Sequence, residues 1–96
     1  MIPTIGYISR IMIRPAPHSE ILTTLDKLAP SDEAVVTNVE ASPELRRRLM
    51  EAGFVTGSRV RFLMATPFGD PLVFSLRGAS IALRKIEAHS IHVRVA

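Results

Sequence analysis

Alternating apolar and polar residues fill the stretch "SRVRFLMATPFGDPLVFSLRGASIALRK" (Ser58–Lys85), a pattern typical of half-buried β-strands. Gly69 and Gly78 divide it into three segments, as glycine does at turns. The pattern therefore predicts three successive strands. Their inward-facing residues are Val60, Phe62, Met64, Leu72, Phe74, Leu76, Ile81 and Leu83.

Two further segments extend the predicted sheet on either side of this stretch. "EAVVTNVE" (Glu33–Glu40) is rich in β-branched residues but does not alternate cleanly, which favours a bulged or doubly buried strand. "SIHVRV" (Ser90–Val95) alternates, with Ile91, Val93 and Val95 facing inward. "TTLDKLAP" (Thr23–Pro30) predicts only one helical turn. About five short strands at this spacing predict a mainly β fold, a small barrel.

One α-helix is predicted after the first strand, in "SPELRRRLMEAGF" (Ser42–Phe54). Ser42 is a good N-cap, Pro43 suits the first helical position, and Gly53 suits the left-handed C-cap. Phe54 can then fold back onto the helix. The residues that share its apolar face are Leu45, Leu49 and Ala52.

The consecutive arginines Arg46, Arg47 and Arg48 belong to this helix. Because each residue turns the helix by about 100°, their side chains fan across roughly 200° of its surface. The three side chains cannot form one flat patch, so we interpret the triplet mainly as the solvated face of the helix. Recognition of an acidic partner surface by Arg46 or Arg47 is the alternative.

Composition excludes several classes of protein. The chain has 96 residues, enough for one small domain, and contains no cysteine, which rules out disulfides and thiolate zinc sites. The net charge is only +3 and the aromatic content only 5%, so a nucleic-acid partner is not expected. No catalytic motif is recognisable, and we expect a protein that is not an enzyme.

The first residues differ in character from the rest. Residues 1–21 contain an apolar run interrupted by Pro3, Gly6 and Arg10, too short for a membrane span of about 20 residues. We expect an N-terminal extension over 1–21, either loosely ordered or adding a strand, and a compact domain over 22–96.

A second candidate for partner binding is the turn around Phe68, Gly69 and Asp70. Gly69 and Asp70 favour a turn, and Phe68 falls outside the alternating strand pattern. Its aromatic ring either folds onto the barrel or stays exposed as an interface anchor.

The histidines make weak candidates for a metal site. His89 and His92 are three residues apart, which on a strand sends their side chains to opposite faces. A surface zinc or ferrous ion shared between two chains, with Glu87 or Asp70 adding oxygen, is the better version of the site. A homodimer therefore stays open.

The order of these features resembles the FeoA family over about Leu25 to Val95. The resemblance rests on several short matches: Ala52-Gly53-Phe54 at the helix end, Gly57, Gly69-Asp70-Pro71 with Leu72, Gly78, Ala82-Leu83-Arg84, Ala88, and the final Ile91 and Val93. The extension before Thr23 is longer than in most members of that family.

The resemblance implies an SH3-like barrel with a helix inserted after the first strand. It also implies a cytoplasmic accessory protein of bacterial ferrous iron uptake that requires no cofactor. Such a protein binds and modulates the membrane iron permease FeoB, which carries a GTP-binding domain, and reaches the membrane only through the cytoplasmic part of that partner. The alternative is a metal-binding or metal-sensing domain that uses surface histidines and carboxylates.

Overall fold

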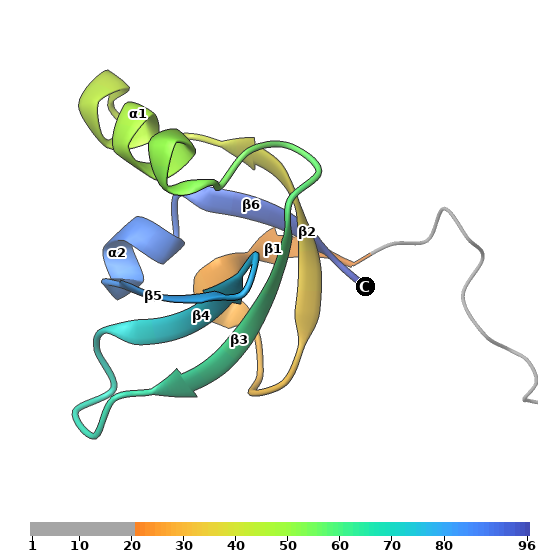
Figure 1. The fold of residues 1–96 in the computed structure, drawn as a ribbon, viewed down its shortest axis with the longest axis vertical. Helices are drawn as coiled ribbons and strands as arrows, with labels where there is room; N and C mark the ends of the chain where they lie inside the picture. The colour runs from red at the N-terminus through yellow and green to blue at the C-terminus, as the bar shows by residue number, and fades with distance from the viewer. Residues whose placement is uncertain (1–20) are drawn as a thin grey trace, which may run out of the picture.

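A curved antiparallel sheet with two α-helices at one end makes up residues 21–96, the part of the chain that the computed structural model describes (Figure 1). The strands are β1 (Leu22–Thr24), β2 (Glu33–Val39), β3 (Arg59–Ala65), β4 (Leu72–Leu76), β5 (Ala79–Leu83) and β6 (Ile91–Val95). The helices are α1 (Pro43–Ala52), α2 (Lys85–Ala88) and a 3-10 turn, η1 (Leu25–Lys27). Of the predicted extension 1–21, residues 1–20 lie outside the described part.

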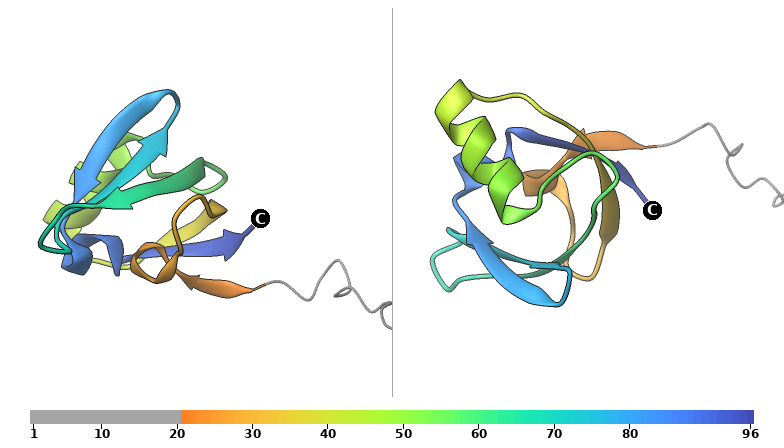
Figure 2. Two further views of the ribbon diagram at one scale, coloured as in Figure 1. Left: turned by 90° about the horizontal axis from the view of Figure 1, so that it is seen from below. Right: turned by 45° about the horizontal axis from the view of Figure 1, so that its top comes forward.

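The strands are arranged in the order β1-β6-β2-β3-β4-β5. The sheet folds over so that β3, β4 and β5 face β2, β6 and β1 across the core (Figure 2). Among residues 21–96 no pairing joins β5 to β1, so the predicted barrel is an open six-stranded sheet. The strand beyond the predicted five is β1, and its three residues are too few to show an alternating pattern.

The predicted inward faces of the strands form the core. Phe62 and Phe74 pack against each other across β3 and β4, with their ring centroids 5.3 Å apart and their planes tilted by 39°. Met64 is an exception, since 53% of it is exposed. The pairing of β3 with β4 shifts register between Phe62 and Met64, which turns Met64 away from the core. The predicted irregularity in Glu33–Glu40 is confirmed by a similar shift in β2, between Val36 and Asn38.

Helix α1 lies between β2 and β3 and begins and ends as its sequence predicts. The Leu45 amide donates to the Ser42 hydroxyl over 3.3 Å, which caps the first turn. Gly53 adopts a φ of 114°, and the Phe54 amide donates back to the Leu49 carbonyl over 3.0 Å. This reversal brings Phe54 under the helix, where it is fully buried.

The buried face of α1 is narrower than predicted. Leu49 is buried and Leu45 packs against the core from a partly buried position. Ala52, expected on the same face, is exposed. Because the chain turns at Gly53, Phe54 rather than Ala52 fills the space beneath the helix end.

Helix α2 was not predicted. The sequence pattern extends the last-but-one strand to Lys85, whereas β5 ends at Leu83 and a four-residue helix follows. So short a helix has no apolar period to recognise. Neither α1 nor α2 is long and apolar enough to cross a membrane, and no other helix in residues 21–96 is either.

Candidate functional site

The arginines of α1 point in different directions, as their spacing predicts. The Arg46 Nε donates to the Val39 carbonyl over 3.3 Å, which holds this side chain against β2. Arg48 pairs with Glu87 of α2, with 2.7 Å between Nη2 and Oε2. Arg47 is exposed between them. Arg46 and Arg47, but not Arg48, line a hollow beside α1.

That hollow lies beside α1 and has a volume of about 560 Å³. Much of its wall is apolar, and Met50, 39% exposed, stands within it. Its charged lining residues are the two arginines and Glu51. The lining residues are Ala41, Pro43, Arg46, Arg47, Met50, Glu51 and Val55.

The loop between β3 and β4 is a tight, hydrogen-bonded turn. The Thr66 amide donates to the Pro71 carbonyl over 3.1 Å, and the Gly69 amide donates to the Thr66 carbonyl over 2.7 Å. Gly69 has a φ of 83°, a backbone conformation that favours glycine. Phe68 sits at the tip and is 97% exposed. The sequence allowed the Phe68 ring either to fold onto the barrel or to stay exposed, and in the structure it is exposed.

Helix α2 joins this loop to α1. The Lys85 amide donates to Asp70 Oδ1 over 2.9 Å, which ties the loop to the first turn of α2. The carboxylate of Glu87, which also holds Arg48, accepts from the Arg84 amide over 2.9 Å. The loop, α2 and α1 consequently share one end of the molecule (Figures 1 and 2). Ile86 of α2, 78% exposed, adds a second large apolar side chain there.

Ile86 was missed because α2 was missed. The available signal was Glu87, an acidic residue placed to accept from the backbone amide three residues before it.

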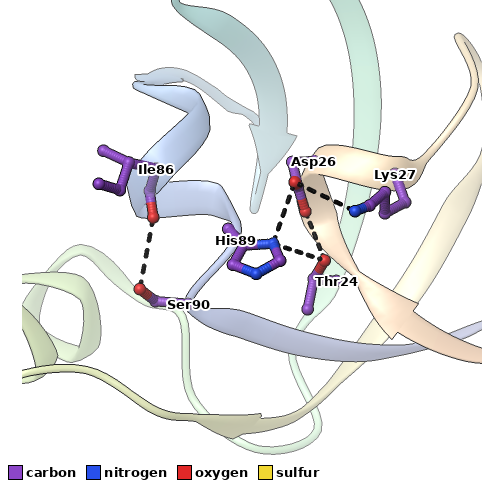
Figure 3. Close-up of polar contacts among 6 residues, drawn as sticks. All are labelled: Thr24, Asp26, Lys27, Ile86, His89 and Ser90. Atoms are coloured by element: carbon purple, nitrogen blue, oxygen red, sulfur yellow. Dashed lines mark hydrogen bonds and ion pairs between the residues drawn. The ribbon is translucent and has the colours of Figure 1, made fainter.

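His89 and His92, the metal candidates, contact different carboxylates. His89 Nδ1 lies 3.1 Å from Asp26 Oδ2 and 3.5 Å from the Thr24 hydroxyl (Figure 3). His92 Nε2 lies 3.0 Å from Glu40 Oε1. The two imidazoles are thus oriented by separate parts of the fold.

No metal centre forms around these histidines within residues 21–96, where no three His, Asp or Glu side chains converge. The two oxygen donors suggested by the sequence are engaged elsewhere. Asp70 caps α2, and Glu87 pairs with Arg48. Within residues 21–96, each of these histidines therefore has one carboxylate neighbour, Asp26 for His89 and Glu40 for His92.

The Asp26 carboxylate belongs to the same cluster as His89 and is itself only 16% exposed (Figure 3). Burial raises its pKa, but this is outweighed by hydrogen bonds from Thr24 and His89 and by the charges of His89 and Lys27. The net result is a pKa below the ordinary value of 3.8. The cluster connects Thr24 of β1 and Asp26 of η1 to His89 at the C-terminal end of α2, and it helps to fix the position of α2.

A lowered pKa in the folded state makes stability depend on pH in a defined direction. The ionised Asp26 stabilises the fold above its unfolded-state pKa, and this contribution disappears as the pH falls through the lower, folded-state pKa. We expect Asp26→Asn to lower the free energy of unfolding by about 1–2 kcal/mol at pH 7, as loss of a hydrogen bond to a charged group does. The difference from the original chain should shrink as the pH falls below 3.8 and through the lower folded-state pKa.

Urea unfolding between pH 7 and pH 2 measures this effect. Glu51→Gln is the control, since it removes a carboxylate from the exposed surface of α1. A destabilisation by Asp26→Asn that stays constant down to pH 2 would contradict the role given to the Asp26 charge.

Comparison with known proteins adds a family to this geometry. Residues 23–95 match the model of a family described as "FeoA domain". A Porphyromonas gingivalis protein, the Fe(2+) transport protein A/Fe(2+) transporter FeoB fusion protein, is 31% identical over 71 residues. That alignment covers 74% of this chain but 8% of the fusion protein, so the chain spans only a small part of that relative.

Two solved structures show the same fold. The solution structure of FeoA from Chlorobium tepidum is 38% identical, with a TM-score of 0.72, and the match covers 76% of this chain and 70% of that one. The crystal structure of Stenotrophomonas maltophilia FeoA complexed with zinc is 37% identical, with a TM-score of 0.67, covering 74% and 88%. The Stenotrophomonas protein is described as a prokaryotic SH3 domain protein.

Proposed function

Because the chain belongs to the FeoA family, we propose that it is an accessory module of ferrous iron uptake that binds and modulates the iron transporter FeoB. The observation that carries the proposal is the Porphyromonas gingivalis relative, in which a FeoA sequence and FeoB form one polypeptide. Covalent linkage keeps two domains at high effective concentration, which is advantageous when they act on each other. The Stenotrophomonas maltophilia relative has been suggested to act as an activating factor for bacterial ferrous iron transport.

The end of the molecule formed by α1, α2 and the β3–β4 loop is the surface that fits this role. It combines two features of interaction sites, exposed apolar anchors and arginines beside an apolar hollow. In this proposal Phe68 is the principal anchor, Gly69 and Asp70 hold its loop, and Arg46 and Arg47 face carboxylates of the partner. The module is not an enzyme, acts in the cytoplasm, and reaches the membrane through FeoB.

Co-purification with the cytoplasmic part of FeoB tests the proposal. We expect a complex that survives gel filtration, and a change in GTP turnover when the full chain is added. The sign of that change distinguishes activation from inhibition. Failure to bind, together with unchanged GTP turnover, would reject the proposed function.

A second candidate function is surface binding of a divalent metal ion, and the zinc complex of the Stenotrophomonas relative favours it. A tetrahedral zinc site needs four ligands. Within residues 21–96, His89 contacts one carboxylate, that of Asp26, and His92 contacts one, that of Glu40. We therefore expect weak zinc binding that brings two chains together.

Zinc titration with sedimentation measurements checks this prediction. His89→Ala or His92→Ala should abolish the zinc-dependent dimer, whereas Asn38→Ala, a change at an exposed position on β2, should not. Tight binding of one zinc ion by a single monomer would contradict a shared surface site.

A further inference from the structure

The outer face of the sheet carries a basic hollow, away from the core and formed by β2, β3 and β4. Its volume is about 350 Å³, and its lining comprises Glu33, Arg59, Val60, Arg61, Ser75 and Arg77. Three of these six residues are arginines. None of them belongs to the surface proposed to bind FeoB.

Strand register explains why these side chains converge. Arg61 lies directly between Glu33 of β2 and Ser75 of β4. Arg59 lies two residues earlier on β3, so its side chain leaves the same face of the sheet. Arg77 follows the last residue of β4 and reaches the hollow from the turn. The three guanidinium groups therefore come from two neighbouring elements.

The positive charge of the hollow is not neutralised from within. Arg61 engages Glu33 Oε2 through Nη2 at 2.6 Å and Nε at 3.2 Å. Arg59 Nη1 lies 3.6 Å from the other oxygen of the same carboxylate. Within residues 21–96, no hydrogen bond or ion pair engages the Arg77 side chain. One carboxylate thus faces three guanidinium groups.

Glu33 orients the arginines as well as pairing with them. The hydrogen bond from Arg61, followed by the charges of Arg61 and Arg59, keeps the pKa of Glu33 below its ordinary value. The two hydrogen bonds from Arg61 to this carboxylate hold the Arg61 guanidinium in place. An arginine positioned in this way loses less freedom when it binds an anion.

The backbone at Arg77 is a second, independent observation that singles out this residue. Arg77 has a φ of 54° and Gly78 a φ of 83°, and together they form the two-residue turn between β4 and β5. A turn with two positive φ values favours asparagine or aspartate followed by glycine. Arginine is disfavoured at the first position, and strained residues of this kind cluster at functional sites.

We propose that this hollow binds a phosphate group, with Arg77, Arg59 and Arg61 holding its oxygens and the hydroxyl of Ser75, another lining residue, as a further donor. The planar guanidinium fork matches the oxygens of phosphate and binds them through paired, charge-assisted hydrogen bonds. The phosphate could belong to a soluble compound or to a lipid headgroup, since both present the same oxygens. The site is independent of the proposed binding to FeoB.

Isothermal titration of the full chain with inorganic pyrophosphate, at low and at physiological salt, tests the soluble source. Co-sedimentation with phosphatidylcholine vesicles, with and without phosphatidylglycerol, tests the lipid source. We expect binding to pyrophosphate, to the phosphatidylglycerol vesicles, or to both, and any of these results supports the proposal. Binding to neither probe would overturn it.

Arg77→Asn is the decisive variant. Removing one charge-assisted contact should weaken phosphate binding by roughly tenfold. Because asparagine suits the positive φ, the melting temperature should stay the same or rise, which separates loss of binding from loss of folding. Arg59→Ala should weaken binding in the same way.

The matched control is Arg84→Ala, which removes the same charge from an exposed position beyond the opposite end of β5. It should leave phosphate binding unchanged. Equal weakening by Arg84→Ala and Arg77→Asn would show a diffuse charge effect and would overturn the proposed site.

Discussion

Leu49→Ala is expected to lower the free energy of unfolding by about 2–5 kcal/mol, as truncation of a buried leucine does. Leu49 is 2% exposed and joins α1 to the core. Phe54, just beyond the end of the helix, is fully buried in the same core. The alanine would leave a cavity between the helix and the sheet. A domain of this size has only about 5–15 kcal/mol of net stability, so the variant should be partly unfolded at elevated temperature.

Urea unfolding monitored by circular dichroism measures the loss. Leu45→Ala should have a smaller effect, about 1–2 kcal/mol, because Leu45 is only partly buried. Arg47→Ala is the matched control on the exposed face and should change stability by less than about 0.5 kcal/mol. If Leu49→Ala unfolds at the same urea concentration as the original chain, the packing of α1 described above is wrong.

Phe68→Ser is expected to weaken binding to FeoB by roughly 30-fold or more while leaving the melting temperature unchanged. The first expectation follows from the energy that a central aromatic anchor contributes to an interface, about 2 kcal/mol or more. The second follows from the structure, in which Phe68 is 97% exposed and contributes almost nothing to the core. The loop itself should persist, since its hydrogen bonds come from the backbone of Thr66, Gly69 and Pro71.

Two further variants make this measurement specific. Ile86→Ser should weaken binding too, because Ile86 is 78% exposed and α2 lies at the same end of the molecule (Figure 1). Leu22→Ser is the control: Leu22 is 69% exposed but lies on β1. A complex that forms equally well with Phe68→Ser would remove the loop from the proposed interface, whereas a large drop in melting temperature would mean that Phe68 packs onto the fold in solution.

Much of the fold was predictable because its signals are local. The caps of α1 depend on Ser42 and Gly53, which act on backbone groups within a few residues. The alternation in β3, β4 and β6 reflects the two-residue period of a strand, whichever strand lies beside it. The FeoA family was recognisable for the same reason, since its short matches follow the order of these elements.

The features that the sequence did not reveal depend on residues far apart in the chain. Met64 turns outward because β3 and β4 shift register, and a single strand carries no sign of its partner's register. Strand β1 exists because β6 pairs with it, and α2 is held by Asp70 and by Arg48, neither of which is near it in sequence.

The same distinction between local and long-range signals applies to the candidate sites. The sequence alone determined that Arg46, Arg47 and Arg48 diverge, because their directions follow from the turn of one helix. It left two positions open for the Phe68 ring, and only the packed structure selected exposure, because the core is already filled by Phe62, Phe74 and their neighbours. Likewise, only the tertiary structure brought Arg59, Arg61 and Arg77 around one hollow, since side chains from different strands meet through the register of the sheet and not through their order in the chain.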